Sequence, residues 1–241
     1  MTTLARITIA LILALLFSSC GFDINFGNGK KGNGNIEEDQ RTVSGDFSGV
    51  SASEGLDVYI TQGTDYEILV EADENVIDLI ATELKNGVLQ IHTIKNIGRA
   101  TKKIYVTLPE ITVLKTSSGA DLIAKSAVRA ETIQLNASSG SELQIDDLNA
   151  DKVSANTSSG ADLKIAGQAT TFYSNASSGS AIKASDLTTA VCRANASSGA
   201  RITVNVTESL SADASSGADI QYTGNAKVEG KRSSSGSVRQ L

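Results

Sequence analysis

The chain has 241 residues, of which 40% are hydrophobic and 4% aromatic, and a formal net charge of −6. Its apolar fraction excludes wholesale disorder and permits a sizeable core. A pI ≈ 4.9 without a basic cluster argues against a nucleic-acid partner and against electrostatic binding to anionic lipid. Because tryptophan is absent, we expect a core of Ala, Val, Ile and Leu arranged in thin, regular layers.

Residues 1–19 have the features of a secretory signal peptide. Arg6 supplies a positive charge, and Ile7 to Phe17 is an almost unbroken apolar run, too short for a transmembrane helix of about 20 residues. Phe17-Ser18-Ser19-Cys20 resembles the lipobox of bacterial lipoproteins, which implies cleavage before Cys20 and acylation of that residue. The alternative is an ordinary secretory signal with a chance cysteine. A lipidated Cys20 would anchor the protein to the bacterial outer membrane, at the cell surface or on the periplasmic face.

Residues 20–45 are predicted to be the lipidated cysteine followed by a flexible tether. Gly27 to Asn35 contains only Gly, Asn and Lys, a low-complexity composition that does not bury a core. Such a tether would hold a folded domain away from the membrane.

Residues 46–115 are predicted to be an N-terminal β section. Strands are expected at residues 56–60, 66–72, 89–91 and 104–108, where apolar residues alternate with others or run between turn signals. Residues 75–85 are predicted to form a helix, because apolar residues recur at i, i+4 and i+8 from Val76. Asn86-Gly87 would end this helix at a glycine.

Residues 116–241 are periodic. The tripeptide Ser-Ser-Gly recurs every 18 to 21 residues, with its glycines at Gly119, Gly140, Gly160, Gly179, Gly199, Gly217 and Gly236. This period indicates stacked coils, and the alternation around each glycine predicts two inward-facing strands that meet at a Ser-Ser-Gly corner. The fold class is therefore all-β, a right-handed parallel β-helix or solenoid of about 20-residue coils. The 75–85 helix would be inserted in it or cap its end, and Ser53-Glu54-Gly55 matches the corner as an early copy.

One polar position in each coil is the candidate binding site. It lies four residues before the glycine and is occupied by Asn136, Asn156, Asn175, Asn195 and Asp213. Since coils stack about 4.8 Å apart, these side chains should form a ladder. The ladder has two interpretations: amide-to-amide hydrogen bonding that stabilises the stack, or a regular polar strip that recognises a glycan or protein ligand.

No catalytic residue, metal site or cofactor is predicted. Cys192 occupies an inward position, so its expected role is packing. His92 is the only histidine, which leaves no triad and no multi-histidine metal site. Arg239 also falls at an inward position of the last coil, which predicts a charged cap against edge pairing.

Two groups of acids suggest alternatives. A column two residues after the glycine contains Asp57, Asp121, Glu142, Asp162 and Asp219. It is similar to calcium-binding β-rolls, but those have half this period and Ala181 and Arg201 interrupt the column. Asp146-Asp147 is an acidic pair in the joining loops and is the candidate centre of a carbohydrate-active enzyme.

The order of these segments resembles the putative autotransporter-adhesin head GIN domain family, common among Bacteroidetes lipoproteins. The resemblance rests on the lipobox, the Gly/Asn segment and the sequences Asp57–Gly63, Asn86–Ile91, Val106–Pro109 and the Ser-Ser-Gly-Ala-Asp repeats, and it covers about residues 46–225. It implies a β-helical fold in the cell envelope and brings no catalytic residues. We therefore expect a non-enzymatic, lipid-anchored adhesin that binds a glycan or protein. A structural or docking protein inside the envelope, and a carbohydrate-active β-helix enzyme, are the alternatives.

Overall fold

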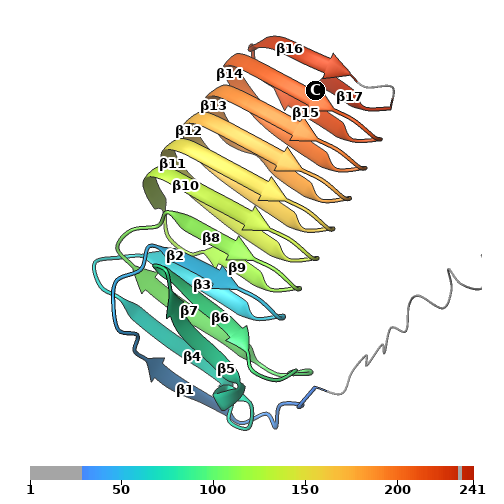
Figure 1. The fold of residues 1–241 in the computed structure, drawn as a ribbon. Coiled ribbons are helices and arrows are strands. Elements are labelled where there is room, and N and C mark those ends of the chain that lie inside the picture. Colours follow the sequence, from blue (N-terminus) through green and yellow to red (C-terminus); the bar gives the residue numbers. More distant parts are fainter. Residues whose placement is uncertain (1–28, 233–234) are drawn as a thin grey trace, which may run out of the picture.

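The computed structural model describes residues 29–232 and 235–241, whose strands stack into one elongated β-helix (Figure 1). The strands are β1 (Ile36–Arg41), β2 (Gly49–Ala52), β3 (Asp57–Gln62), β4 (Glu67–Asp73), β5 (Ile80–Lys85), β6 (Val88–Thr93), β7 (Lys102–Leu108), β8 (Val113–Thr116), β9 (Asp121–Ala124), β10 (Val128–Ala137), β11 (Glu142–Thr157), β12 (Asp162–Ala176), β13 (Ala181–Ala196), β14 (Arg201–Ala214), β15 (Asp219–Thr223), β16 (Lys227–Arg232) and β17 (Ser237–Gln240). No helix in this described part is long and apolar enough to cross a membrane. The predicted parallel β-helix is confirmed.

Each coil is held by parallel pairing to the coils above and below it. From β10 to β14, the long strands pair in parallel with their neighbours, with register shifts at or next to the stretch that joins one coil to the next. Mostly small or aliphatic side chains alternate into the interior. In β11 the inward positions change phase twice, so the coil turns twice between Ile145 and Val153. The stretch joining one coil to the next is therefore a third, narrow side of the β-helix, and it buries Leu148 and Ala150. The repeat predicts this stretch as an edge of variable loops, but it also contributes to the core.

The Ser-Ser-Gly corner is a tight turn in which two residues adopt positive φ. Ser159 has a φ of 52° and Gly160 a φ of 71°, and the Ala161 N–H donates to the Ser158 carbonyl at 3.2 Å. These features are those of a type I′ turn. The turn also joins the stack, because the Gly160 N–H donates to the Ser178 carbonyl of the next coil at 3.1 Å.

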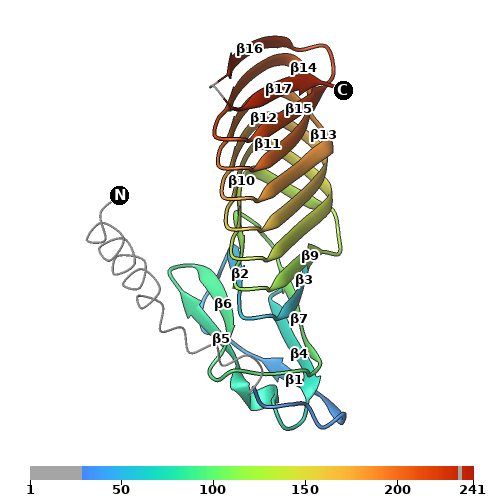
Figure 2. The ribbon, with the colours of Figure 1, turned by 90° about the vertical axis from the view of Figure 1, so that its right-hand side faces the viewer.

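The N-terminal end of the stack, here called the base, does not follow chain order. Strands β2 and β3 form a coil that lies between β6–β7 on one side and β8–β9 on the other. Antiparallel strands then extend the base, with β4 on β7, β1 on β4 and β5 on β6 (Figures 1 and 2). The early corner copy is confirmed, since Glu54 and Gly55 have positive φ and the Gly55 N–H donates to the Ser118 carbonyl.

The predicted helix at residues 75–85 is wrong. Only a 3-10 turn forms, η1 (Ile77–Leu79), and β5 follows it directly. Asn86 and Gly87 have φ values of 52° and 73°, so they form the turn of a β-hairpin with β6, for which Asn-Gly is strongly preferred. The apolar spacing suits a helix, but the hairpin turn and the antiparallel pairing of β5 with β6 determine the structure.

The flexible tether predicted for residues 20–45 is also corrected, from residue 29 onward. β1 is an antiparallel strand at the edge of the base. Before it, residues 30–35 are tied to the domain by backbone hydrogen bonds and by the buried carboxylate of Asp73, which accepts from the N–H groups of Gly34 and Thr101. This segment buries few apolar groups, so composition alone does not reveal that it is ordered. Residues 1–28, which include the predicted signal peptide and Cys20, lie outside the described residues.

Candidate functional site

The predicted ladder brings four asparagines together on the strand face that precedes the Ser-Ser-Gly corners. Asn156 Nδ2 donates to Asn136 Oδ1 at 3.1 Å, Asn175 Nδ2 to Asn156 Oδ1 at 3.0 Å, and Asn195 Nδ2 to Asn175 Oδ1 at 2.9 Å. The register of β10 to β14 imposes this alignment because each asparagine is paired with the next across adjacent strands.

Asp213 continues the row of asparagines, opposite Asn195 in the register of β13 and β14. An ionised carboxylate has no proton to donate to the Asn195 amide oxygen. The row therefore ends in two neighbouring hydrogen-bond acceptors, both reachable from solvent because Asp213 is exposed and Asn195 half-buried.

A shallow groove of ≈ 570 Å³ follows this row across the coils. Its polar lining is formed by the ladder, the first serines of the corners and one threonine: Asn136, Asn156, Asn175, Asn195, Asp213, Ser138, Ser158, Ser177, Ser197, Ser215 and Thr157. Two parallel lines of hydrogen-bonding groups thus repeat at the spacing of stacked strands, about 4.8 Å.

An aromatic and two cationic side chains lie beside the groove. Tyr173 is 38% exposed, and the Lys152 Nζ lies 5.2 Å from the centroid of its ring. Arg193 is exposed and pairs with Tyr173 across β12 and β13, and exposed Val191 lies on the same strand. The sequence analysis did not predict this cluster. The alternation does predict that Tyr173 points outward, because it lies between the inward residues Phe172 and Ser174, and Arg193 lies likewise between Cys192 and Ala194.

The acidic column lies on the other long strand face. Asp121 is opposite Asp57 on one side and Glu142 on the other. Burial and the charges of Asp57 and Glu142 raise the pKa of the Asp121 carboxyl. Asp162 differs, because the Lys183 ammonium lies 3.0 Å from its carboxylate. Within the described residues, no group of three or more His, Cys, Asp or Glu side chains has the geometry to hold a metal ion.

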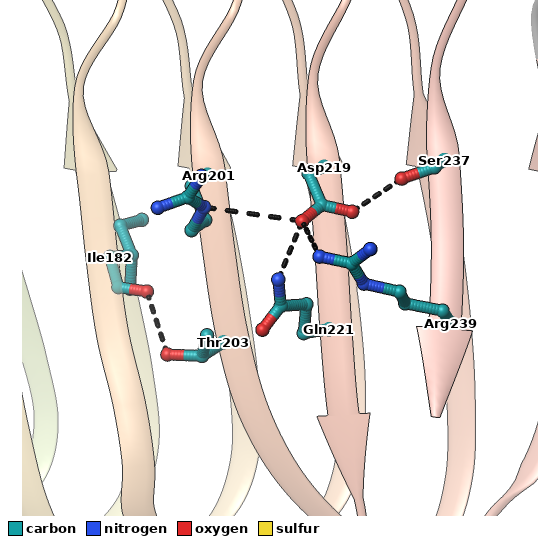
Figure 3. Close-up of polar contacts among 7 residues, drawn as sticks. All are labelled: Ile182, Arg201, Thr203, Asp219, Gln221, Ser237 and Arg239. Atoms are coloured by element: carbon teal, nitrogen blue, oxygen red, sulfur yellow. Dashed lines mark hydrogen bonds and ion pairs between the residues drawn. The ribbon is translucent and has the colours of Figure 1, made fainter. Parts of the chain in front are cut away.

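At the C-terminal end, the carboxylate of Asp219 joins the last three coils (Figure 3). It accepts from Ser237 and from Gln221 Nε2 at 2.6 Å, while Arg239 Nη2 lies at 3.0 Å and Arg201 Nε at 3.9 Å. Burial raises the pKa of Asp219, but these hydrogen bonds and the two guanidinium groups outweigh burial and lower it. Arg239 points outward and not inward as predicted. Ser237, one residue after its corner glycine, pairs with Asp219, two residues after its own, so the last strand is shifted by one residue relative to the repeat.

The remaining candidates have structural or isolated positions. Cys192 is 1% exposed, and burial raises the pKa of its thiol to about 12, so the predicted packing role is confirmed. His92 lies on β6 with its Nε2 3.7 Å from Glu83 of β5. Asp146 accepts from Gln144 Nε2 and lies 3.5 Å from Lys164 Nζ, so its charge is engaged by neighbours on the outer face.

The comparisons with known proteins agree with this architecture. The model of the family described as putative auto-transporter adhesin, head GIN domain, matches residues 46–226. A putative adhesin from Bacteroides fragilis has 20% identity and a TM-score of 0.79, with 88% of this chain and 100% of that chain covered.

A second solved structure, a putative lipid binding protein from Parabacteroides distasonis, has 20% identity and a TM-score of 0.73, with coverages of 88% and 98%. A putative adhesin from Parabacteroides merdae has 19% identity and a TM-score of 0.71, again with coverages of 88% and 98%. These likenesses establish a shared fold. No curated protein matches the chain.

Proposed function

Because the chain belongs to the head GIN domain family of putative auto-transporter adhesins, we propose that it is a non-enzymatic envelope protein that binds glycan chains along the asparagine groove. A lipid on Cys20 would anchor it to the outer membrane. The family name and the similar structures support an adhesin-like role.

The observation that carries this proposal is the hydrogen-bonding capacity left on the ladder. An amide has two N–H donors and an oxygen with two lone pairs. Asn156 and Asn175 each spend one donor and one acceptor on their neighbours in the ladder. Each retains one donor and one acceptor on a half-buried or exposed side chain, which is the combination that a sugar hydroxyl pair satisfies.

The lining of the groove favours a polyhydroxylated ligand over an acyl chain. Eleven of its fourteen lining residues carry an amide, hydroxyl or carboxylate group, and leaving such groups unpaired against an acyl chain is unfavourable. Tyr173 supplies a partly exposed ring beside the groove, and Arg193 and Lys152 add positive charge. Acidic glycans are therefore the favoured members of the class.

A glycan panel tests the proposal. The purified mature chain is screened against neutral and acidic polysaccharides and against matrix proteins, and Asn175→Ala, Tyr173→Ala and Arg193→Ala are compared with Lys183→Ala on the opposite face. We expect acidic glycans to bind and each groove variant to weaken binding by about tenfold, or 1.4 kcal/mol, while Lys183→Ala leaves it unchanged. Absence of glycan binding, or equal losses in all four variants, refutes the proposal.

Anchoring and exposure are tested separately in cells. Cys20→Ala is expected to abolish incorporation of labelled palmitate and to release the protein from the membrane fraction. Added protease should remove the domain from intact cells if it acts as a surface adhesin. Complete protection would instead favour the docking role inside the envelope.

A further inference from the structure

Two segments far apart in sequence meet at one corner of the base. The Lys30 N–H donates to the Asn96 carbonyl at 3.0 Å, the Gly98 N–H donates back to the Lys30 carbonyl at 3.1 Å, and the Gly32 N–H donates to the Arg99 carbonyl at 3.0 Å. Residues 30–32 therefore run beside the loop that joins β6 to β7, like an added strand. Figure 1 shows this loop at the same edge as the Ser-Ser-Gly corners, at the end of the stack opposite the C-terminus.

This corner, here called the basal tip, consists of Lys30, Lys31, Ile94, Lys95 and Arg99. Its four cationic residues are all exposed, and none of them forms an ion pair with any residue in the described part of the chain. Ile94 is 57% exposed, the largest exposure of any isoleucine with a described environment. Around this corner, the carboxylates of Glu54, Glu74 and buried Asp73 accept hydrogen bonds. Asp78 is exposed beside Leu79, whose carbonyl accepts the Ile94 N–H. A local cationic cluster with an apolar centre thus lies on an acidic protein.

The basal tip is also where the chain enters the domain. Gly29 packs so closely against Gly98 that a Cβ atom on Gly29 would lie 2.3 Å from the Gly98 nitrogen. Only nine peptide steps separate Cys20 from Gly29, so this stretch spans at most about 32 Å even when fully extended. A tether reaching to residue 46 would span about 90 Å. Fixing residues 29–45 to the base therefore brings the domain close to any lipid on Cys20.

We propose that the basal tip contacts the anionic phospholipid headgroups of the membrane that holds the Cys20 lipid, with Ile94 entering the interface between the lysines. This inference rests on the lipid anchor of the proposed function. Exposed Lys and Arg residues are attracted to anionic headgroups within a Debye length of the surface. Their long side chains can pack their methylene groups beside an apolar residue in the interface while the charged groups stay among the headgroups. The β-helix then stands with its base on the membrane and its C-terminal coils outward.

A single introduced tryptophan tests this contact, because the chain has none of its own. The full-length lipidated protein with Ile94→Trp is reconstituted on vesicles of phosphatidylcholine, with or without phosphatidylglycerol. Val191→Trp, at an exposed position beside the groove, is the matched control. A third protein combines Ile94→Trp with Lys30→Glu, Lys31→Glu and Lys95→Glu. Vesicle flotation, tryptophan emission and quenching by brominated lipid are measured for each.

The expected result is flotation of every sample, with a blue shift and lipid quenching for Ile94→Trp on phosphatidylglycerol vesicles only. The charge-reversed protein and the Val191→Trp control should float without either signal. Raising the salt from 0.1 M to 1 M shortens the Debye length from about 10 Å to about 3 Å and should reduce the blue shift. Flotation with an unshifted, unquenched reporter, or equal signals on both vesicle types, overturns the inference while preserving the anchor. Absence of flotation overturns the anchor and the inference with it.

Discussion

At the corners of the coils, serine residues adopt the left-handed conformation that side chains usually avoid. Six second serines of the repeat have φ between 51° and 54°. From Ser139 to Ser216, the carbonyl of each such serine accepts a hydrogen bond from the glycine N–H of the preceding corner. The conformation aims that carbonyl along the stack, and the repeated hydrogen bond offsets the strain of a residue with a Cβ atom in this region.

Gly160 and Gly167 are glycine for different reasons: one only because its φ is positive, the other also because a side chain would not fit. Both Gly160 and Gly167 have positive φ, but a Cβ on Gly160 meets nothing within 4 Å, whereas on Gly167 it would lie 2.1 Å from the Leu148 carbonyl oxygen. Gly160→Ala should lower the free energy of unfolding by about 1 kcal/mol, the cost of conformation alone. Gly167→Ala should lower it by about 3 kcal/mol or more, because the coil beneath must move. Denaturant midpoints of the two variants check the ranking, and equal losses would contradict it.

Asp121 should make stability depend on pH in a defined direction. Burial and the charges of Asp57 and Glu142 raise its pKa in the folded state. A raised carboxyl pKa means that the folded state binds the proton more tightly than the unfolded state, so this contribution is full at acidic pH and is lost as the pH rises through the raised pKa. Asp121→Asn should therefore raise the melting temperature at pH 7 and leave it nearly unchanged at acidic pH.

Asp162→Asn is the matched control for Asp121→Asn. It lies in the same column but has Lys183 at 3.0 Å, so it should not raise the melting temperature at pH 7. A similar gain in both variants would show that the column as a whole is repulsive and that the environment of Asp121 is not special.

At the scale of elements, the last strand depends on the carboxylate of Asp219. It is the common partner of Ser237 and Arg239 in β17 and of Gln221 in β15. Asp219→Ala should release β17, seen as faster amide hydrogen exchange in residues 237–240 at pH 7, with little change in β11 and β12. Because the pKa of Asp219 is lowered, its stabilisation is present at neutral pH and is lost as the pH falls through the lowered value. The difference between wild type and variant should shrink accordingly; a constant difference would contradict it.

The elements differ in how far the sequence predicts them. From β8 onward, alternation about a repeated corner identifies the strands because the same residues serve burial and turning in every coil. The strand β5 is not predicted, since its apolar spacing also suits a helix and only the Asn-Gly turn distinguishes them. The strand β1 leaves no apolar signal either, because four of its six residues are exposed and pairing with β4 fixes it.

The candidate site shows the same division. The asparagine row follows from the period, because register alone superimposes residues at equal distances from the corner. Tyr173 and Arg193 occur once each in their row, so no repetition marks them, and their proximity depends on adjacent coils. The basal tip could not be predicted from the sequence, since residues 30–32 and 96–99 are brought together only by backbone pairing.

At the scale of the whole molecule, one buried carboxylate determines where the N-terminal segment enters. Asp73→Ala leaves the N–H groups of Gly34 and Thr101 without their acceptor, which should cost about 1–3 kcal/mol of stability. Residues 29–41 should become sensitive to limited proteolysis while the coils from β8 onward stay protected. Asp73→Asn keeps one acceptor oxygen and should lose less. Unchanged cleavage in Asp73→Ala would show that β1 pairing alone holds the segment.

The parallel register that aligns the asparagines also fixes the mechanical behaviour of the domain. If the base is held at the membrane and a ligand pulls on the outer coils, tension acts along the stack, in the direction of the hydrogen bonds between coils. A coil is joined to the next by a single covalent crossing, so it can detach whole while those beneath stay folded. Each detachment frees about 20 residues, or about 65 Å of extended chain. The domain would therefore lengthen in nearly equal steps from its outer end, and this extension would limit the force on the bond between the domain and its ligand.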